Sequence, residues 1–365
     1  MSKIRVIHHS KYCGYSGTDR VAQLFCKYLK QNDNFEPFLV YRDNDPTNTR
    51  LDILRDWLGD DHVVPYHWVP GKRGRQSPYL PEEDNLFEVI EKIDPQIIHV
   101  HYSGYNEHPA FRWLCPNAKW IGTNIFGYHE NDPQMDLVIY ICNYIYNTAI
   151  KGGGVNGPIL YNPVELPHAT NKLYCRNKLI AKFNLPTNAI ILGRVGRQDN
   201  FDGISLNALK LITDEFPNVF YLVVNPCENW SRVARQLNLN NVKFLPTIIN
   251  DMELSEFYLG LDIYAHARHD GEINPVNIVE AQSHRLPVIS HRSKIHNGQS
   301  EIIGDTGFVV PIDDHAAYAE VLSALIQDST MRKSFGDMAY ERFLQNSSAE
   351  TIVQKLEGLY EKLLD

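Results

Sequence analysis

The sequence lacks several features that would place it in a common class of protein. Its six cysteines form no C-x-x-C pair, which argues against a zinc site and against a disulfide framework. No apolar run approaches the ~20 residues that a membrane-spanning helix requires. Dense runs of lysine and arginine are also missing, and the net charge is −9, so nucleic acid is not an expected partner.

The N-terminus is short and soon polar, so it does not resemble a signal peptide. Together with the scattered cysteines, this leads us to expect a reduced, cytoplasmic protein with no integral membrane segment. The chain has 365 residues, of which 43% are hydrophobic and 22% are charged. This length is enough for two domains of ordinary size, and the composition is normal for a globular protein.

Strand-like and helix-like segments alternate along the chain, which predicts the α/β class with parallel sheets covered by helices. A glycine-rich cluster at 151–158 contains a G-x-G-x-x-G match. It follows a predicted helix rather than a strand, so it does not fit a dinucleotide site. The expected strands of the first half are 4–8, 38–41, 96–101, 120–123 and 137–141, and a second alternating series runs from 190 to 310.

The last segment carries an apolar stripe at helical spacing. Ser347 and Glu350, three residues apart, match a capping box at the start of this helix. Such a stripe requires a partner surface. It consists of Ile352, Val353, Leu356, Leu359, Tyr360, Leu363 and Leu364.

Two glutamates, Glu272 and Glu280, are separated by seven residues in a segment between two expected strands, 261–266 and 286–290. A strand that ends in a polar, glycine-containing loop and opens a helix is where α/β proteins bind anions, because the first helical N–H groups lack partners. A fully helical connection would put the two glutamates about 12 Å apart. That distance exceeds the ~5–9.5 Å of glycoside hydrolases, so a two-carboxylate hydrolase is not expected.

This pair resembles the E-x7-E signature of retaining glycosyltransferases of the GT-B fold, in particular glycosyltransferase family 4 (glycosyl transferases group 1). Other segments resemble blocks of that family in the same order, over nearly the whole chain. They are 14–21, 241–246, 285–289, 297–302 and 306–311.

The resemblance implies an α/β protein of two Rossmann-like domains, whose parallel sheets face each other across a cleft. The domain boundary is expected between about 162 and 171. Residues 1–164 would form the acceptor-side domain, with the helix at 346–365 packing back on it. Residues 165–345 would form the domain that binds the nucleotide sugar.

The resemblance also implies roles for residues around the two glutamates. Glu280 is expected to accept hydrogen bonds from the ribose hydroxyls, since an ionised carboxylate accepts from both. Glu272 is expected to be catalytic and to contact the donor sugar. Gly17 in the glycine-rich loop and Ile249 in a loop beside the base are also expected near the donor. The helix N-terminus, where the family offers backbone N–H groups, corresponds to Asn274, Pro275, Val276 and Asn277.

Arg197 matches an arginine that faces the diphosphate in the family, and a guanidinium suits phosphate oxygens. The family places a lysine a few residues further on, but Asp202 stands there in this chain. The departure removes one cation and adds one anion. Arg194 is close in sequence, at the end of a predicted strand.

Asn124 occupies the place where many family members have a histidine, and it is the second expected catalytic residue. An amide bonds sugar hydroxyls but does not take a proton at neutral pH. His129 lies further along the same loop and is an alternative. His99 and His101 share a face of a predicted strand, but a metal site needs at least one more ligand, so structural roles are favoured.

The function implied is a retaining, metal-independent glycosyltransferase that needs no cofactor besides its donor, a UDP- or GDP-linked sugar. The acceptor would be a hydroxyl of a glycan or another molecule. Two alternatives stay open. One is a degenerate GT-B protein that binds nucleotide or glycan without turnover, and the other is a GT-B sugar-nucleotide epimerase or hydrolase.

Overall fold

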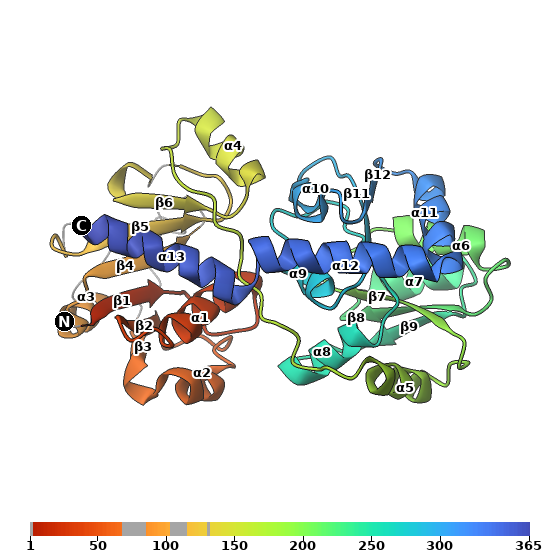
Figure 1. The fold of residues 1–365 in the computed structure, drawn as a ribbon, viewed down its shortest axis with the longest axis horizontal. Coiled ribbons are helices and arrows are strands. Elements are labelled where there is room, and N and C mark those ends of the chain that lie inside the picture. Colours follow the sequence, from red (N-terminus) through yellow and green to blue (C-terminus); the bar gives the residue numbers. More distant parts are fainter. Residues whose placement is uncertain (1–2, 68–84, 103–114, 130–131) are drawn as a thin grey trace. The chain divides into compact units, whose positions relative to one another are not determined.

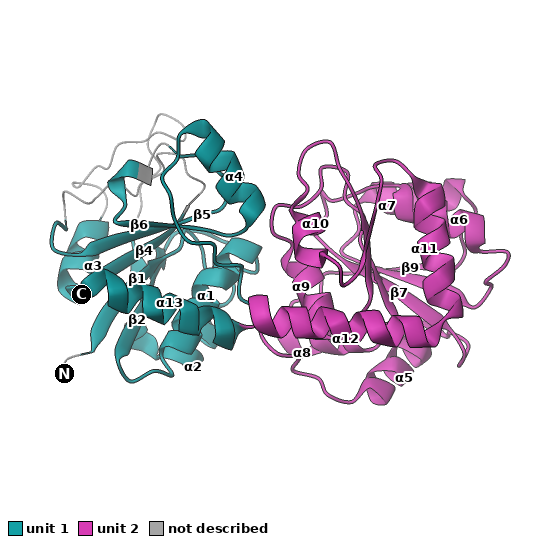
Figure 2. Ribbon diagram, turned by 45° about the horizontal axis from the view of Figure 1, so that its top comes forward, with its two compact units in different colours: residues 1–163, 349–365 teal, residues 164–348 magenta. Residues whose placement is uncertain are grey.

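The computed structural model describes residues 3–67, 85–102, 115–129 and 132–365. The chain divides into two compact units, Met1–Pro163 with Ala349–Asp365, and Val164–Ser348 (Figure 1 and Figure 2). The boundaries expected from the sequence were after residues 164 and 345.

The described residues of the first unit form a parallel six-stranded sheet of order β3-β2-β1-β4-β5-β6. The central strands are buried on both faces, as the continuous apolar runs of the sequence require. The strands are β1 Ile4–His9, β2 Phe35–Arg42, β3 Val63–Tyr66, β4 Ile97–Tyr102, β5 Lys119–Asn124 and β6 Leu137–Tyr140. The helices are α1 Gly17–Leu29, α2 Leu51–Leu58, α3 Leu86–Ile93, α4 Asn143–Gly152 and α13 Ala349–Leu364.

Most of the apolar stripe of the last segment is buried in the first unit, and Leu364 at its end is exposed. Ile352, Val353, Leu356 and Tyr360 of α13 join a core with Phe25 of α1. Each buried aliphatic side chain of this size contributes about 1.5–3 kcal/mol. Figure 2 shows α13 in the colour of the first unit, although it follows the second unit in sequence.

The capping box expected at the start of α13 is misplaced. Ser347 is instead the C-terminal cap of α12, and its N–H donates to the carbonyl of Phe343 at 2.8 Å. The final helix therefore begins at Ala349, after a bridge between Ser348 and Val164.

The second unit forms another parallel six-stranded sheet, of order β12-β11-β10-β7-β8-β9. Its strands are β7 Ile190–Val195, β8 Val219–Val224, β9 Val242–Leu245, β10 Ile263–Ala265, β11 Val288–His291 and β12 Phe308–Val310. Its helices are α5 Lys172–Phe183, α6 Ile204–Ile212, α7 Glu228–Gln236, α8 Asp251–Leu259, α9 Val276–Ser283, α10 Gly298–Ile303, α11 His315–Gln327 and α12 Ser329–Asn346.

Both sheets have the strand order of the Rossmann fold, which confirms the α/β class expected from the sequence. In such sheets the strand order reverses between two neighbouring central strands. Ligands bind beyond the carboxyl ends of these two strands. The reversal lies between β1 and β4 in the first unit and between β7 and β10 in the second. These two points are where functional residues are expected.

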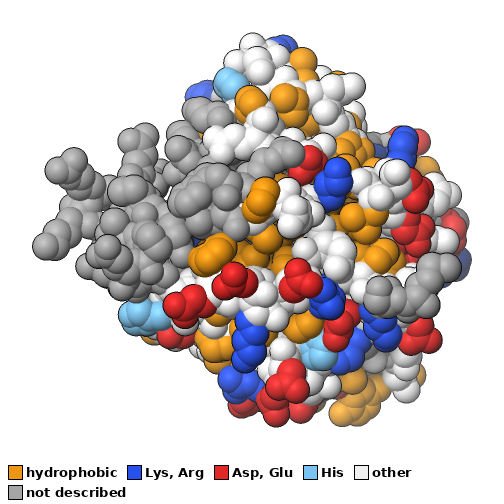
Figure 3. Space-filling view, turned by 90° about the vertical axis from the view of Figure 1, so that its left-hand side faces the viewer, with side chains coloured by type: hydrophobic (Ala, Val, Ile, Leu, Met, Phe, Trp, Pro, Cys, Tyr) orange, Lys and Arg blue, Asp and Glu red, His pale blue; other side chains and the backbone are white. Residues whose placement is uncertain are grey.

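Two surface properties bear on the kinds of partner. Among the described residues, the helices are all too short or too polar to cross a membrane. On the face drawn in Figure 3, the described Lys and Arg side chains are interspersed with Asp and Glu.

Candidate donor-binding site

The candidate site of the second unit lies where β7 and β10 run side by side, with Ile263 paired to Leu192. Gly196 and Arg197 follow the carboxyl end of β7, and the loop that carries Glu272 follows β10. The fold therefore brings together two segments that are more than seventy residues apart in the sequence. Both had been singled out from the sequence alone.

Glu272 is fixed by its backbone and by its side chain. Its N–H donates to Gln299 Oε1 at 2.9 Å, and its carbonyl accepts from Gly298 N at 2.8 Å. Its carboxylate is only 12% exposed and accepts from Arg268 Nη1 at 2.8 Å. The other carboxylate oxygen lies 3.4 Å from His266 Nε2. Burial lowers the pKa of His266, so the neutral imidazole is favoured there.

Arg268 links the acidic residues of this loop. Its Nε and Nη2 donate to the two carboxylate oxygens of Asp270 at 2.5 and 2.8 Å, while Nη1 reaches Glu272. The hydrogen bond from Arg268 lowers the pKa of the Asp270 carboxyl. Sequence reasoning gave Arg268 no role, although its position four residues before Glu272 was a usable signal.

Two glycines allow the Glu272 loop to pack closely against the segment 293–298. Gly271 has a φ of +68°, and a Cβ there would lie 1.9 Å from the carbonyl oxygen of His296. A Cβ on Gly298 would lie 1.7 Å from the carbonyl oxygen of Ile273. No side chain fits at either contact, so the loop that carries Glu272 depends on both glycines.

Glu280 lies on α9, one helix turn beyond the N-terminal residues of that helix. Its Oε2 accepts from the Tyr258 hydroxyl at 2.9 Å. Burial raises the pKa of Tyr258, and the nearby Glu280 carboxylate raises it further, so the phenol remains a hydrogen-bond donor. This contact orients the carboxylate.

The N-terminus of α9 faces the end of β7. Asn277 Nδ2 donates to the carbonyl of Val195 at 2.9 Å. The N-cap is Pro275, which offers no side-chain acceptor to the first N–H groups. A helix N-terminus without a side-chain cap is a suitable partner for an anionic group. Asn274 lies directly before this cap, and Val276 is the first residue of the helix.

The two residues expected at the diphosphate have different surroundings. Arg197 has a side chain that is 70% exposed and pairs with the exposed Asp199, at 3.1 and 2.7 Å. Asp202 instead accepts from the N–H of Ile204 at 2.8 Å, in the first turn of α6, and lies 3.9 Å from His291 Nε2. The aspartate that stands in place of a lysine therefore helps to start a helix.

Arg194 is buried beneath this loop. Its Nη2 donates to the carbonyl of Asn200 at 2.9 Å, and its guanidinium stacks on the Trp230 ring at 4.8 Å. A Cβ on Gly196 would lie 2.6 Å from this guanidinium. Arg194 is a buried cation under the loop rather than a group at its surface.

Two further residues were expected near the donor. Ile249 is exposed in the loop between β9 and α8. Gly17 is in the first unit, where it is the first residue of α1, after the N-cap Ser16.

Asn124 ends β5 in the first unit, and its amide is engaged by its own loop. Its Nδ2 donates to the carbonyl of Tyr128 at 2.6 Å, and its Oδ1 accepts from Gly127 N at 2.8 Å. Both polar ends thus hold a turn. His129, the alternative, packs against Gly152, where a Cβ would lie 2.6 Å from its ring.

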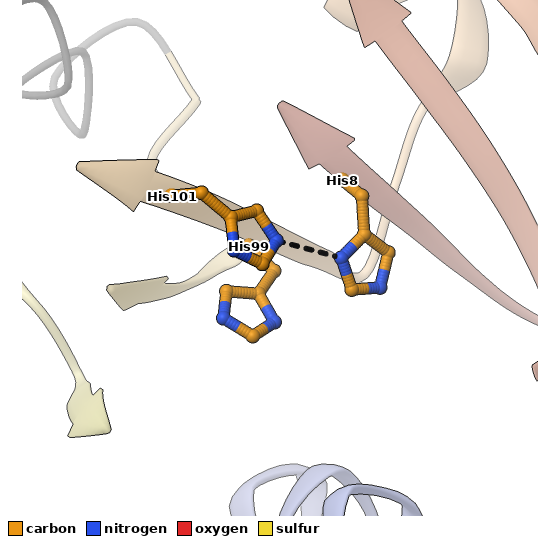
Figure 4. Close-up of side chains that lie close together, drawn as sticks. All are labelled: His8, His99 and His101. Atoms are coloured by element: carbon orange, nitrogen blue, oxygen red, sulfur yellow. Dashed lines mark hydrogen bonds between the residues drawn. The ribbon is translucent and has the colours of Figure 1, made fainter. Parts of the chain in front are cut away.

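The first unit also contains a buried histidine cluster, His8, His99 and His101 (Figure 4). His99 and His101 share a face of β4, as expected, and β1 supplies His8 beside them. Their nitrogens lie close enough together to be considered as metal ligands.

Most of the ring nitrogens in this cluster have a hydrogen-bond partner, so they do not require a metal ion. His8 Nδ1 is 3.2 Å from His101 Nε2, and Tyr360 Oη lies 2.6 Å from His99 Nδ1 and 3.2 Å from His8 Nε2. Burial lowers the pKa of each histidine, that of His101 to about 3. The cluster is therefore a neutral network that holds α13 against the sheet.

Comparison with known proteins finds a family match in the unit that contains the candidate donor-binding site. Residues 176–342 match the family model described as Glycosyl transferases group 1. The match lies entirely within the second unit. The enzyme class expected from the sequence, a glycosyltransferase, agrees with this match and with the relatives below.

The relatives act in polysaccharide biosynthesis, as their names state. CapM of Staphylococcus aureus, a capsular polysaccharide biosynthesis glycosyltransferase, is 27% identical over 198 residues, 52% of this chain and 50% of CapM. AmsD of Erwinia amylovora, an amylovoran biosynthesis glycosyltransferase, is 26% identical over 154 residues, 42% of each chain. The chain thus spans half or less of the length of these relatives.

Two solved structures share the fold. A glycosyltransferase from Rickettsia africae has a TM-score of 0.80 at 18% identity, with 100% of each chain covered. Alr3699/HepE of Anabaena, in complex with UDP-glucose, has a TM-score of 0.76 at 15% identity, covering 98% of this chain and 100% of that one. These likenesses confirm the two parallel-sheet, Rossmann-like halves of the GT-B fold.

Proposed function

We propose that the protein transfers a sugar from a nucleotide-diphosphate sugar to a hydroxyl of a glycan or related acceptor. The observation that carries the proposal is the pairing of Glu272 and Glu280 around the N-terminus of α9, at the point where β7 and β10 meet. A carboxylate on each side of an uncapped helix N-terminus suits a ligand with hydroxyls at both ends and phosphate between them.

Each part of the donor has a matching group in this proposal. Glu280, oriented by Tyr258, accepts from the ribose hydroxyls. Glu272, oriented by Arg268, meets the donor sugar. The N-terminus of α9 and Arg197 face the diphosphate. The exposed pair of Arg197 with Asp199 is worth only about 0–1 kcal/mol, so phosphate competes with it easily.

The finer chemistry is part of the same proposal. We propose transfer with retention of the anomeric configuration and without a metal ion, as the E-x7-E resemblance implies. A uridine diphosphate sugar is the first donor to test, because Alr3699/HepE was solved with UDP-glucose. The amide of Asn124 holds the turn at Gly127 and Tyr128, and its expected catalytic role stays a prediction.

A second candidate function is nucleotide or glycan binding without turnover. Asp202 favours it, because it removes the lysine that the family places beside the diphosphate. Epimerisation or hydrolysis of the donor is a third candidate, which needs no acceptor.

One experiment separates the three candidates. Thermal shift first selects the nucleotide sugar from UDP-, GDP-, ADP- and dTDP-linked donors, since a ligand at 100 times its Kd adds about 2.7 kcal/mol of stability. The selected donor is then incubated with and without EDTA and with candidate acceptors, and the products are followed by proton NMR. Acceptor-dependent product of unchanged anomeric configuration, with EDTA present, supports the proposal. An inverted product or donor loss without an acceptor contradicts it.

A further inference from the structure

A cavity of about 720 Å³ opens in the second unit at the sheet edge opposite to the donor site. Asp262 and Pro287, which line it, stand directly before β10 and β11, at their amino ends. Glu272 and Arg197, by contrast, follow the carboxyl ends of β10 and β7. The volume is in the range of small-molecule sites, so the cavity is large enough for a ligand of its own.

Cationic side chains outnumber acidic ones around this cavity. Its walls come from the segment before α5, from the ends of α8 and α9, and from the first half of α12, which packs against α9 (Figure 2). Two aspartates line it, Asp262 and Asp337. The cations that line it are Lys172, Arg285, Arg332 and Lys333. In a chain of net charge −9, this is a local excess of positive charge.

The two aspartates are already occupied. Asp262 accepts from Arg176 Nη1 at 2.6 Å and from the N–H of Ile191 at 2.8 Å. Asp337 accepts from Arg285 Nη1 at 2.8 Å and from Lys333 Nζ at 2.6 Å. Asp337 is thus shared by two cations, while both hydrogen bonds to Asp262 end on its Oδ2, and Asp262 attracts Lys172 without forming an ion pair with it.

Lys172 and Arg332 are the other two cations of the cavity. Arg332 Nη1 donates to the carbonyls of Leu325 and Ile326 at 2.6 and 2.8 Å, which fixes the guanidinium at the end of α11. Within the described part of the chain, Lys172 has no hydrogen-bond or ion-pair partner, nor do Nε and Nη2 of Arg332. Desolvation lowers the pKa of Lys172, and although Asp262 opposes this, Arg176 and Arg332 lower it further. The four cations that line the cavity therefore exceed the negative charge of its two aspartates.

We propose that this cavity binds a small organic phosphate, with the phosphate group between Lys172 and Arg332. A guanidinium with free N–H groups and an ammonium are both strong donors to phosphate oxygens.

The other lining residues suit the organic part of such a ligand. The hydroxyls of Thr170 and Ser329 suit a sugar-like body, and apolar contact comes from Leu166, Pro167, Leu259, Pro287 and Tyr340. The site is separate from the donor site, so the proposal does not depend on glycosyl transfer.

The test is a calorimetric titration of ribose 5-phosphate into the full chain at low ionic strength. Saturable binding at one site is expected, and Lys172→Gln and Arg332→Gln are each expected to weaken it about tenfold or more. Lys182→Gln is the matched control, because Lys182 lies on the same helix α5 but outside the cavity. Arg197→Ala is the control for phosphate binding at the donor site, and it is expected to leave this affinity unchanged.

Three outcomes overturn the proposal. The first is the absence of saturable binding to the unaltered chain. The second is an equal loss in Lys182→Gln, which would indicate unspecific attraction, or a loss in Arg197→Ala, which would place the phosphate at the donor site. The third is Lys172-dependent co-sedimentation with phosphatidylglycerol vesicles without binding of ribose 5-phosphate, which would assign the cavity to a lipid headgroup. Because the Lys172 side chain makes no hydrogen bond to any described residue, Lys172→Gln is informative even if Arg332→Gln unfolds.

Discussion

The guanidinium of Arg268 and the carboxylate of Glu272 form a hydrogen-bonded ion pair at 2.8 Å, with side chains that are 17% and 12% exposed. An ion pair so shielded from water is screened little by salt, and it holds the carboxylate in one orientation. The same guanidinium also donates two hydrogen bonds to Asp270, which fix its orientation. The position of the Glu272 carboxylate therefore depends on Arg268.

Arg268→Gln is therefore expected to lower kcat more than it weakens nucleotide binding. Loss of the orienting hydrogen bond should reduce kcat about 10- to 100-fold, equivalent to about 1.4–2.7 kcal/mol. Asp270→Asn is the control, because it keeps the bond between Arg268 and Glu272. Steady-state kinetics and nucleotide calorimetry measure the two effects, and a loss confined to nucleotide affinity would mean that Arg268 binds phosphate instead.

Glu280→Ala should weaken binding of the nucleotide product by about 1.5–3 kcal/mol, the value of a charge-assisted hydrogen bond. Tyr258→Phe removes only the donor that orients Glu280, so its effect should be smaller. Calorimetry with the nucleotide diphosphate compares the variants. Unchanged affinity in Glu280→Ala would remove the ribose role.

Asp202 is expected to affect the stability of the fold through its hydrogen bond and the affinity for a diphosphate through its charge. Different substitutions separate the two effects. Asp202→Lys loses the acceptor for the Ile204 N–H and should destabilise the protein by about 0.5–2 kcal/mol. Asp202→Asn keeps an acceptor and removes the charge, so it should preserve stability and tighten diphosphate binding at low salt. Urea unfolding and calorimetry at two salt concentrations provide the measurements. If Asp202→Asn leaves the affinity unchanged, this carboxylate lies too far from the diphosphate to matter.

The same substitution, glycine to alanine, is expected to have opposite effects on stability at two helical glycines. A Cβ on Gly336 of α12 would lie 2.1 Å from the carbonyl oxygen of Arg285, whereas one on Gly358 of α13 would meet nothing within 4 Å. Gly336→Ala should cost about 1–3 kcal/mol through this clash. Gly358→Ala should stabilise by up to about 1 kcal/mol through helix propensity. Urea unfolding tests both, and equal effects would contradict the close packing of α12 on Arg285.

The histidine cluster predicts loss of stability in acid. The pKa of His8, His99 and His101 is lowered in the folded state, so their contribution is fully present above about pH 6.5 and is lost as pH falls toward the folded values. At pH 5 the loss of folding stability from His101, whose folded pKa is about 3, is about 2 kcal/mol. Urea unfolding of the wild type and of His101→Phe at pH 7.5 and 5 measures it. An unreduced pH dependence in His101→Phe would exclude this histidine as its source.

Local patterns in the sequence predicted most of the strands, but not β3 at Val63–Tyr66. The expected strand at 190–195 is β7 with the same bounds, because an apolar run followed by glycine has few other structures. Glu272 and Glu280 were found through spacing, and the fold places them at the junction of β7 and β10.

What the sequence did not show depends on pairing between distant segments. His8 is the third member of the histidine cluster because β1 lies beside β4, and strand order cannot be read from either strand alone. Asp202 matched a family lysine by position, but its side chain is used by a local helix start. The cavity at Lys172 and Arg332 requires α5 and α12, which are separated by most of the second unit.

The place of α13 has a consequence for the order of folding during synthesis. The apolar side chains that it covers, including Phe25, belong to the part of the chain that is made first. They remain without their partner until all of Val164–Ser348 has been translated. Domains usually fold from the N-terminus onward as they emerge from the ribosome. In this chain, the second unit is the first that has all of its residues, and the first unit completes its core last.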